Sequence, residues 1–333
     1  MMKMTAVLLA TTFALGMSLG ASAQNGWTQI GDMPIEKWEP STTVLDGKLY
    51  TFGGYTAGVK SSKLCYVFDP KKDSWTRFQD LPSAISHINV VQDDKGVWFA
   101  GGFKDGYKDH VIAEVWHYNW ELDRYTAGPL LPEKRGGGGL AIIGRNLHFI
   151  SGIKSDRDTD ATDHWVLNLD DWAYGDGKAN WEKRAPIPVG RNQFSCAVVK
   201  GKIYCVGGQF FHDKGQLDQK MVDIYDPATD SWSKAPSLEK GHSHAEGSTF
   251  VHNDSIYVLG GHTTADGESK KIDGDIIRLK YGAKSWEVVG KLPMPLSSPA
   301  ACIIGDTLYV GGGNSNFKGM VVEKRFYKRD IPK

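Results

Sequence analysis

The amino-acid sequence predicts an all-β fold of six repeats, each forming a four-stranded antiparallel sheet. Three observations support this prediction. A β-hairpin pattern ending on a glycine pair occurs six times, the copies are evenly spaced, and a downstream aromatic residue accompanies each copy. The composition suits a globular protein, because 41% of the 333 residues are hydrophobic and 23% are charged.

The stretch 190–209 shows the repeated unit most clearly. Two apolar runs, 194–199 and 203–206, flank a Lys-Gly turn at 200–201, and a glycine pair follows at 207–208. The same pattern returns at 44–55, 91–103, 142–153, 251–262 and 303–314. The second glycines lie at 54, 102, 152, 208, 261 and 312, which gives spacings of 48, 50, 56, 53 and 51.

The second half of each repeat carries a strand that leads to an aromatic residue, followed in most repeats by an apolar-Pro link. The aromatic residues are Trp27, Trp75, Tyr125, Trp181, Trp232 and Trp286. Four short strands per repeat make one blade of a β-propeller. The glycine pairs and the downstream aromatic residues resemble the Kelch repeat over nearly the whole chain after residue 23.

The phase of the repeat predicts how the ring closes. Trp27 and Pro34 precede the first glycine pair, and no similar segment follows the last pair at 311–312. We therefore expect residues 25–33 to form the outermost strand of the last blade, so that no sheet edge stays open there. The prediction is one domain, 24–333, folded as a six-bladed propeller closed by its N-terminal strand.

Residues 1–23 have the pattern of a signal peptide. Lys3 precedes an apolar stretch from about residue 6 to 17, and Ala21-Ser22-Ala23 is a small-residue cleavage pattern. We expect export to the periplasm or the extracellular space, with no membrane span in the later sequence. With 39 basic and 39 acidic residues, the chain has no net charge that would favour nucleic acid or a membrane surface.

The four cysteines lie in a chain expected to meet an oxidising compartment. Counting outward from the turn at 200–201 places Cys196 opposite Cys205, at a pair where cross-strand side chains are closest. This spacing is compatible with a Cys196–Cys205 disulfide and also with two buried thiols. The pairing of Cys65 and Cys302 stays open.

Candidate ligand-binding residues lie in two sets of segments that should open on the same face of the ring. One set enters the first strand of each blade, and the other follows each glycine pair and is longer and more polar than the turns on the opposite face. The entry segments carry Trp38, His87, Arg135, Arg191, His242, His244 and Glu246. The segments after the glycine pairs begin with Tyr55, Gln209, His262 and Asn314.

This set of side chains suits an acidic sugar. Arg135 and Arg191 would hold a carboxylate, because guanidinium offers a planar fork of donors. His87 and His244 would act as general acid and base. The alternative is structural: the arginines would brace neighbouring blades, and the residues after the glycine pairs would contact water or other loops.

Two segments also contain metal-ligand residue types. His242, His244 and Glu246 would project to one side of a strand and could bind Zn²⁺ or Fe²⁺, or serve in proton transfer and hydrogen bonding without a metal. The acidic run at Asp156, Asp158, Asp160 and Asp163 is compatible with a Ca²⁺ loop or a solvated loop. We expect no cofactor, with a divalent metal as the open alternative.

The resemblance extends to secreted, single-domain bacterial Kelch proteins, the branch that includes N-acetylneuraminate epimerases. The family also contains the propeller domain of galactose oxidase, but we do not expect that activity here, because its copper radical site draws on a Tyr cross-linked to Cys and on a further C-terminal domain. The resemblance implies mutarotase- or epimerase-like conversion of an acidic sugar, while elimination from a uronic acid is a second reaction that the same residues would serve. The alternative is a propeller that binds a glycan or another exported protein without turnover.

Overall fold

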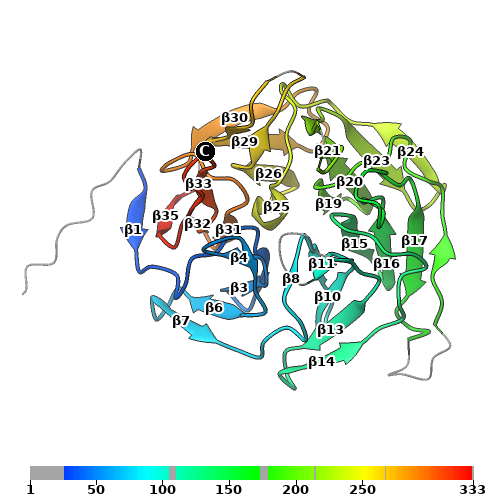
Figure 1. The fold of residues 1–333 in the computed structure, drawn as a ribbon, viewed down its shortest axis with the longest axis horizontal. Coiled ribbons are helices and arrows are strands. Elements are labelled where there is room, and N and C mark those ends of the chain that lie inside the picture. The colour runs from blue at the N-terminus through cyan, green and yellow to red at the C-terminus, as the bar shows by residue number, and fades with distance from the viewer. Residues whose placement is uncertain (1–25, 105–109, 173–178, 214, 267, 332–333) are drawn as a thin grey trace, which may run out of the picture.

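The computed structural model describes residues 26–104, 110–172, 179–213, 215–266 and 268–331. Within these ranges the regular structure is β-sheet, together with one 3₁₀ turn at Glu246–Ser248, and no helix is long and apolar enough to cross a bilayer. Figure 1 shows the sheets arranged around a common centre. The predicted signal peptide, residues 1–23, lies outside the described residues.

Six four-stranded antiparallel sheets form the body of the described chain, and we number them in chain order. They are sheet 1 with β2 (Ser41–Leu45), β3 (Lys48–Phe52), β6 (Tyr66–Asp69) and β7 (Ser74–Arg77); sheet 2 with β9 (Val90–Gln92), β10 (Gly96–Ala100), β13 (Val115–Asn119) and β14 (Arg124–Ala127); sheet 3 with β15 (Gly139–Ile143), β16 (Asn146–Ile150), β17 (His164–Asn168) and β18 (Glu182–Lys183); sheet 4 with β19 (Ser195–Val199), β20 (Lys202–Val206), β23 (Val222–Asp226) and β24 (Ser231–Lys234); sheet 5 with β25 (Thr249–His252), β26 (Ser255–Leu259), β29 (Asp275–Lys280) and β30 (Glu287–Lys291); and sheet 6 with β31 (Ala300–Ile304), β32 (Thr307–Gly311), β35 (Phe326–Asp330) and β1 (Thr28–Ile30).

Shorter strands form small sheets in the segments that precede the first strand or connect the second and third strands. They are β4 (Tyr55–Thr56) with β5 (Lys60–Ser61), β8 (Ile85–Ser86) with β11 (Phe103–Lys104) and β12 (His110–Val111), β21 (Gln209–Phe210) with β22 (Leu217–Asp218), β27 (His262–Thr263) with β28 (Lys271–Ile272), and β33 (Asn314–Asn316) with β34 (Val321–Val322). These segments are therefore ordered by their own strand pairing.

Sheet 6 combines the two ends of the described chain. β1 pairs antiparallel with β35, with Thr28 opposite Lys328 and Ile30 opposite Phe326. This places residues 28–30 at the outer edge of the last sheet, where the repeat phase predicts a strand. The Trp27 side chain is 1% exposed, and its indole N–H donates to the Lys291 carbonyl at the end of sheet 5 (2.8 Å).

In five of the six repeats the aromatic residue donates a hydrogen bond to the segment of the preceding sheet. The exception is Trp75, whose indole N–H has no partner among the described residues and whose ring packs against Phe326 of sheet 6, with 5.1 Å between centroids. The indole N–H groups donate across the boundary in the pairs Trp181 to the Pro129 carbonyl (3.0 Å), Trp232 to Ala185 (2.8 Å) and Trp286 to Pro236 (2.9 Å). In sheet 2 the Tyr125 hydroxyl donates to the Gln79 carbonyl (3.0 Å). The repeated aromatic residue thus supplies both buried apolar area and a directional bond between repeats.

Apolar side chains from adjacent sheets fill the space between them. Leu259 and Ile276 of sheet 5 pack with Leu308 and Val310 of sheet 6, and all four are fully buried. Burying each such side chain contributes about 1.5–3 kcal/mol to stability.

Around the axis, the first strands of the six sheets line a cavity of about 490 Å³. Its lining includes Thr42, Val91, Ala141, Cys196, Thr249 and Cys302.

The hairpin register confirms that Cys196 lies opposite Cys205. Their Sγ atoms are 3.8 Å apart, and both thiols are unbonded in the structure, as are Cys65 and Cys302. A disulfide requires about 2.05 Å between the sulfurs, so the predicted bond is not formed here. Cys65 instead lies 3.6 Å from the Tyr125 hydroxyl.

The last glycine pair is shifted by one residue from its predicted position. Gly311 belongs to β32, whereas Gly312 and Gly313 have the positive φ angles, 65° and 85°, that mark the pair in other repeats. At Gly313 a side chain would also approach the Ser297 carbonyl to 2.8 Å. Only glycine combines this conformation with this close approach.

Candidate functional site

The six entry segments converge on the axis with one shared backbone conformation. Each entry segment contains three residues that we call its entry step, namely 37–39, 85–87, 135–137, 191–193, 242–244 and 296–298. The third residue of each step has a positive φ of about 50–60°. These six third-position residues are Glu39 (54°), His87 (54°), Gly137 (59°), Gln193 (52°), His244 (55°) and Ser298 (48°). Five of the six are not glycine, and non-glycine residues in this conformation concentrate at functional sites.

Backbone hydrogen bonds join these third-position residues around the axis. The N–H of one donates to the carbonyl of the third-position residue in a neighbouring sheet. The five bonds are Glu39 to Ser298 (3.2 Å), Ser298 to His244 (3.0 Å), His244 to Gln193 (3.3 Å), Gln193 to Gly137 (2.9 Å) and Gly137 to His87 (3.2 Å). We call this set the axial ring, and it holds six side-chain positions at one level of the axis.

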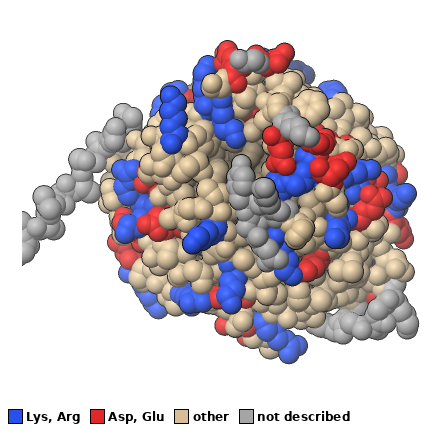
Figure 2. Space-filling view, viewed as in Figure 1, with Lys and Arg blue, Asp and Glu red and all other residues tan. Residues whose placement is uncertain are grey.

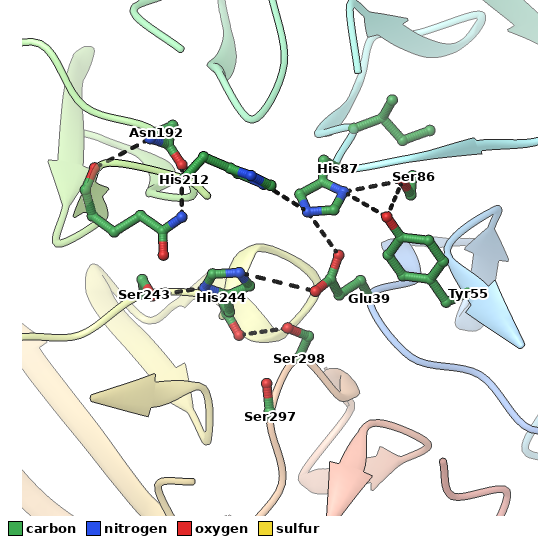
Figure 3. A network of polar contacts seen from close by, with 12 residues as sticks. Glu39, Tyr55, Ser86, His87, Asn192, His212, Ser243, His244, Ser297 and Ser298 are labelled. Carbon is green, nitrogen blue, oxygen red and sulfur yellow. Dashed lines mark hydrogen bonds and ion pairs between the residues drawn. The ribbon is translucent and has the colours of Figure 1, made fainter. Parts of the chain in front are cut away.

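Three side chains of the axial ring meet at one point. Figure 3 shows the Glu39 carboxylate between the imidazoles of His87 and His244. The distance from His87 Nε2 to Glu39 Oε2 is 3.4 Å, and that from His244 Nε2 to Glu39 Oε1 is 4.0 Å. All three side chains are at most 8% exposed. We call these three residues the axial cluster.

The entry step of sheet 2 and a loop of sheet 4 position the His87 ring. Its Nδ1 lies 3.0 Å from Ser86 Oγ, and the Ser86 hydroxyl donates to Tyr55 Oη (2.9 Å). On the other side, His212 places its Nε2 3.4 Å from His87 Nε2. His212 comes from the segment between β21 and β22, so a fourth side chain joins the axial cluster from across the ring.

The His244 ring is fixed by a carboxylate-linked serine. Nδ1 of His244 lies 2.7 Å from Ser243 Oγ, and the Ser243 hydroxyl donates to Asp218 Oδ1 (2.6 Å). The His262 ring packs against His244 with 3.9 Å between ring centroids. These contacts hold Nε2 of His244 toward Glu39.

Burial dominates the electrostatics of the axial cluster. It raises the pKa of Glu39 to about 8, and the nearby Glu246 carboxylate adds to this shift. Burial also lowers the pKa of His87 and of His244 well below the ordinary imidazole value, helped by His212 near His87 and by His262 near His244. The cluster therefore favours neutral side chains when nothing is bound.

The polar first residues of the entry steps bond to groups within the fold, whereas Ile85 and Leu296 at the same position are buried apolar side chains. Arg191 is fully buried and donates to the Gly207, Val189 and Cys205 carbonyls while pairing with Asp223. Arg135 pairs with Glu133 and Asp163, and Lys37 donates to the Gly53 carbonyl (2.7 Å). These contacts favour the structural alternative for both arginines, although the buried Nε of Arg135 has no hydrogen-bond partner among the described residues.

The predicted trio His242, His244 and Glu246 does not line one side of a strand. His244 has a left-handed conformation and Glu246 begins a 3₁₀ turn, so the alternation expected of a strand is broken. His242 instead contacts the Gly260 carbonyl (2.5 Å), as a first-position residue. Among the described residues, the side chains that gather potential metal ligands are Glu39, His87 and His244, whose ligand atoms lie within 4.8 Å of one another.

Glu246 lies near Glu39, whose pKa its carboxylate helps to raise. Burial raises its pKa to about 7, and its Oε1 is buried with no hydrogen-bond partner among the described residues. The acidic run is used within the fold: Asp160 accepts from Asn192 Nδ2 (2.6 Å), Asp163 pairs with Arg135, and Asp156 accepts from the Thr159 N–H (2.9 Å).

The predicted residues after the glycine pairs lie around the same centre, joined to the entry steps by isolated bridges. Trp38 bridges to Tyr55, and their rings are 5.6 Å apart. Gln209 donates to Asn192 Oδ1 (2.9 Å), and His262 Nδ1 lies 3.3 Å from Ser297 Oγ. The remaining predicted residue, Asn314, is fully buried.

Sequence reasoning missed Glu39, His212 and Asp218 as site residues. Glu39 had a partial signal, because it lies 15 residues before the second glycine of its pair, as His87 does. His244 lies 17 residues before its own second glycine, so this alignment puts Glu246 in its place. His212 and Asp218 follow a glycine pair in a loop whose path the sequence does not predict.

On the face seen in Figure 2, acidic and basic side chains are interspersed among uncharged residues.

Comparison with known proteins identifies relatives along most of the chain. A family model for the KLHDC2/KLHL20/DRC7 Kelch-repeats domain matches residues 21–208 and 122–313. The chain is 25% identical over 318 residues to a Kelch repeat-containing protein of Arabidopsis thaliana, covering 86% of this chain and 70% of the relative. It is 24% identical over 302 residues to Kelch domain-containing protein 3 of Rattus norvegicus, covering 80% and 75%.

Other relatives are longer than their matched part. The chain spans 38% of Kelch-like protein terF of Aspergillus terreus and 23% of beta-scruin of Limulus polyphemus. The solved structure of YjhT superposes with a TM-score of 0.72 and 14% identity, covering 89% of this chain and 95% of that chain. At this identity the match shows a shared fold alone.

Proposed function

Because the chain belongs to the Kelch-repeat family, we propose that it is a six-bladed propeller that binds and converts an acidic sugar at the axial ring. The pairing of β1 with β35 supports a ring closed by the N-terminal strand. The pattern of residues 1–23 supports export to the periplasm or the extracellular space. The proposed reaction is the one implied by the resemblance of this sequence to epimerase-type Kelch proteins.

Unsatisfied polar atoms around the axial cluster carry this proposal. Four buried atoms have no hydrogen-bond partner among the described residues: Trp38 Nε1, Gln193 Nε2, Gln209 Oε1 and Asn314 Nδ2. They come from sheets 1, 4 and 6, and each belongs to an entry step or follows a glycine pair. Buried polar groups are normally satisfied, so donors and acceptors gathered in this way fit a ligand rich in hydroxyl groups.

The ring contacts at this end of the axis also suit a sugar. Trp38 lies 5.6 Å from Tyr55 and 6.4 Å from Phe317, measured between ring centroids, so three aromatic residues form one wall. Lys270 places its Nζ 5.2 Å from the Phe317 centroid. We assign to Lys270 the contact with a sugar carboxylate that the sequence predicts for Arg135 and Arg191, because its ammonium would attract that group.

The axial cluster supplies groups for the reaction. Opening and closing a sugar ring moves one proton from the anomeric hydroxyl and one to the ring oxygen, and elimination removes a proton from the carbon next to a carboxylate. Glu39, His87 and His244 lie close enough together to contact one sugar unit. Their placement by Ser86, Ser243 and the axial ring keeps them oriented before a ligand arrives.

The test is turnover of acidic sugars, followed by NMR of the anomeric protons for ring opening and by absorbance of the unsaturated product for elimination. Glu39→Gln and His244→Asn should lower turnover by about 10²-fold or more while leaving the fold intact. Glu268→Gln, in an exposed segment, is the matched control. If both variants change only the affinity for a sugar, the protein is a binding propeller without turnover.

A further inference from the structure

We infer that Glu39, His87 and His244 form a divalent metal site, with His212 as a fourth ligand. This inference shares its location with the proposed function, but it requires no turnover. His87 Nε2 lies 3.4 Å from both Glu39 Oε2 and His212 Nε2, and His244 Nε2 lies 4.0 Å from Glu39 Oε1. Ligands bonded to Zn²⁺ at about 2.0–2.1 Å in a tetrahedron are roughly 3.4 Å apart, so the spacing fits one metal ion.

The hydrogen bonds to Nδ1 of His87 and of His244 indicate which ring nitrogen carries the proton and which has the lone pair. The Ser86 hydroxyl donates to Tyr55 (2.9 Å) and the Ser243 hydroxyl donates to Asp218 (2.6 Å). Each serine oxygen can then accept from the neighbouring histidine Nδ1–H, at 3.0 and 2.7 Å, and these contacts are shorter than the 3.4 Å between His87 Nδ1 and the Tyr55 hydroxyl. Both Nε2 atoms then carry a lone pair toward Glu39. Such outer hydrogen bonds typically orient metal-binding histidines.

His212 has the same orientation. Its Nδ1 lies 2.8 Å from Asp213 Oδ1 and 3.2 Å from Arg157 Nη2. The shorter contact is that of an N–H donating to a carboxylate, which again leaves the lone pair on Nε2. The His212 lone pair then points toward His87 Nε2, at the edge of the group formed by Glu39, His87 and His244, whose ligand atoms lie within 4.8 Å of one another.

A neutral Glu39 carboxyl supplies one O–H for three imidazole lone pairs, so the group still has more acceptors than donors and has room for a cation. Glu39 Oε2 is buried and has no hydrogen-bond partner among the described residues. One divalent ion would satisfy all four groups at once. Imidazole and carboxylate together select Zn²⁺ and neighbouring transition metals, whereas Ca²⁺ and Mg²⁺ prefer all-oxygen sites.

The ligands differ in how firmly the fold holds them. Glu39, His87 and His244 belong to the axial ring, whereas His212 lies in the segment joining β21 to β22. We therefore assign the first three as principal ligands and His212 as the ligand that tightens binding. In the proposed reaction the metal would polarise a sugar oxygen, the role of a Lewis acid.

The test is calorimetric titration of the untagged mature protein after EDTA treatment and dialysis, with Zn²⁺, Mn²⁺, Mg²⁺ and Ca²⁺ as probes. We expect one equivalent of Zn²⁺ to bind, with no saturable binding of Mg²⁺ or Ca²⁺. Glu39→Gln and His244→Asn should each weaken Zn²⁺ binding by about 10²-fold or more, and His212→Ala by about 10-fold. His110→Ala, at an exposed histidine of β12, is the matched control and should leave binding unchanged.

A second measurement uses Co²⁺ in place of Zn²⁺, because its visible absorption reports a tetrahedral site directly. Circular dichroism of each variant establishes that loss of binding is not loss of fold. Absence of stoichiometric Zn²⁺ or Co²⁺ binding, or equal binding by Glu39→Gln and wild type, overturns the inference. Turnover without metal binding would leave the proposed function standing alone, and metal binding without turnover of any sugar would leave only the metal site.

Discussion

The Arg191 guanidinium and the Asp223 carboxylate form a 2.8 Å ion pair in which both side chains are fully buried. Arg191 also donates to the Gly207 carbonyl, so the pair ties the glycine-pair segment of sheet 4 to β23. The residue that sequence reasoning assigned to a ligand is therefore part of the internal support of its sheet.

Removing one partner of this pair should destabilise the protein strongly. Asp223→Ala leaves the buried guanidinium without its partner, and we expect a loss of about 3–5 kcal/mol in the free energy of unfolding, measured by urea denaturation. Lys271→Ala removes an exposed ion pair with Glu268 (2.7 Å) and should cost less than about 1 kcal/mol. Similar losses in the two variants would contradict the structural role of Arg191.

Acid should destabilise the protein through a buried histidine pair in sheet 3. His148 Nδ1 lies 2.9 Å from His164 Nε2, and burial lowers the pKa values to about 3 and about 4. Their charged neighbours are Arg184 and Asp230. Because the unfolded histidines titrate near 6.5, stability is complete above that pH and falls below it. The slope is about 1.4 kcal/mol per pH unit for each imidazole.

The readout for this pair is the difference in slope between wild type and His148→Asn, from unfolding midpoints measured at several pH values between 7 and 4.5. The variant has one buried imidazole fewer, so its stability should fall less steeply. Buried histidines that do not contact His148 contribute equally to both proteins and cancel in the difference, so the difference reports on His148 together with its partner His164. If the stability of both proteins falls equally steeply with decreasing pH, then His148 takes up its proton as readily in the folded protein as in the unfolded one, and the prediction is wrong.

The junction between the two ends of the described chain should be a major source of stability. Trp27 is 1% exposed and bonds to the Lys291 carbonyl, so Trp27→Ala removes a large buried side chain next to β1. We expect a loss of about 3–5 kcal/mol in unfolding free energy. Leu130→Ala, at a side chain that is 64% exposed, should have little effect. Equal effects would mean that β1 contributes little to holding sheet 6.

Mild oxidation should join Cys196 to Cys205. The two residues are paired across β19 and β20 with their sulfurs 3.8 Å apart, so a small side-chain rotation brings them into bonding range. Mass spectrometry should show a loss of two hydrogens that is absent in Cys205→Ser. Closing a loop of this length would add up to about 2–3 kcal/mol of stability. A bond involving Cys65 or Cys302 instead would contradict the prediction.

Much of the architecture is readable from the sequence because the glycine pairs and aromatic residues have local physical causes. Gly207-Gly208 and Trp232 mark positions where backbone conformation and packing restrict the residue type. The one-residue shift of the last pair arose because Gly311, Gly312 and Gly313 are identical in sequence, and only the backbone angles distinguish them.

The site was harder to predict because the first and third residues of one entry step point to different places. His242 braces its sheet, whereas His244 reaches the axis, and residue type does not separate them. A positive φ at Glu39 or His87 has no signature in the residue itself. His212 reaches His87 across the ring, and such a contact depends on a loop path that no local pattern encodes.

The axial ring presents six side-chain positions at the centre of the protein whose backbone hydrogen bonds do not depend on the residue type. Its backbone bonds use only N–H and carbonyl groups, and the same left-handed conformation accommodates Glu39, His87, Gln193 and Ser298 alike. The position of Gly137 differs, because a side chain there would bring its Cβ to 3.2 Å from the Gln193 backbone nitrogen. Adding a functional group at residue 137 would therefore require Gln193 to move by a few tenths of an ångström, and the hydrogen bond between these two ring members would move with it.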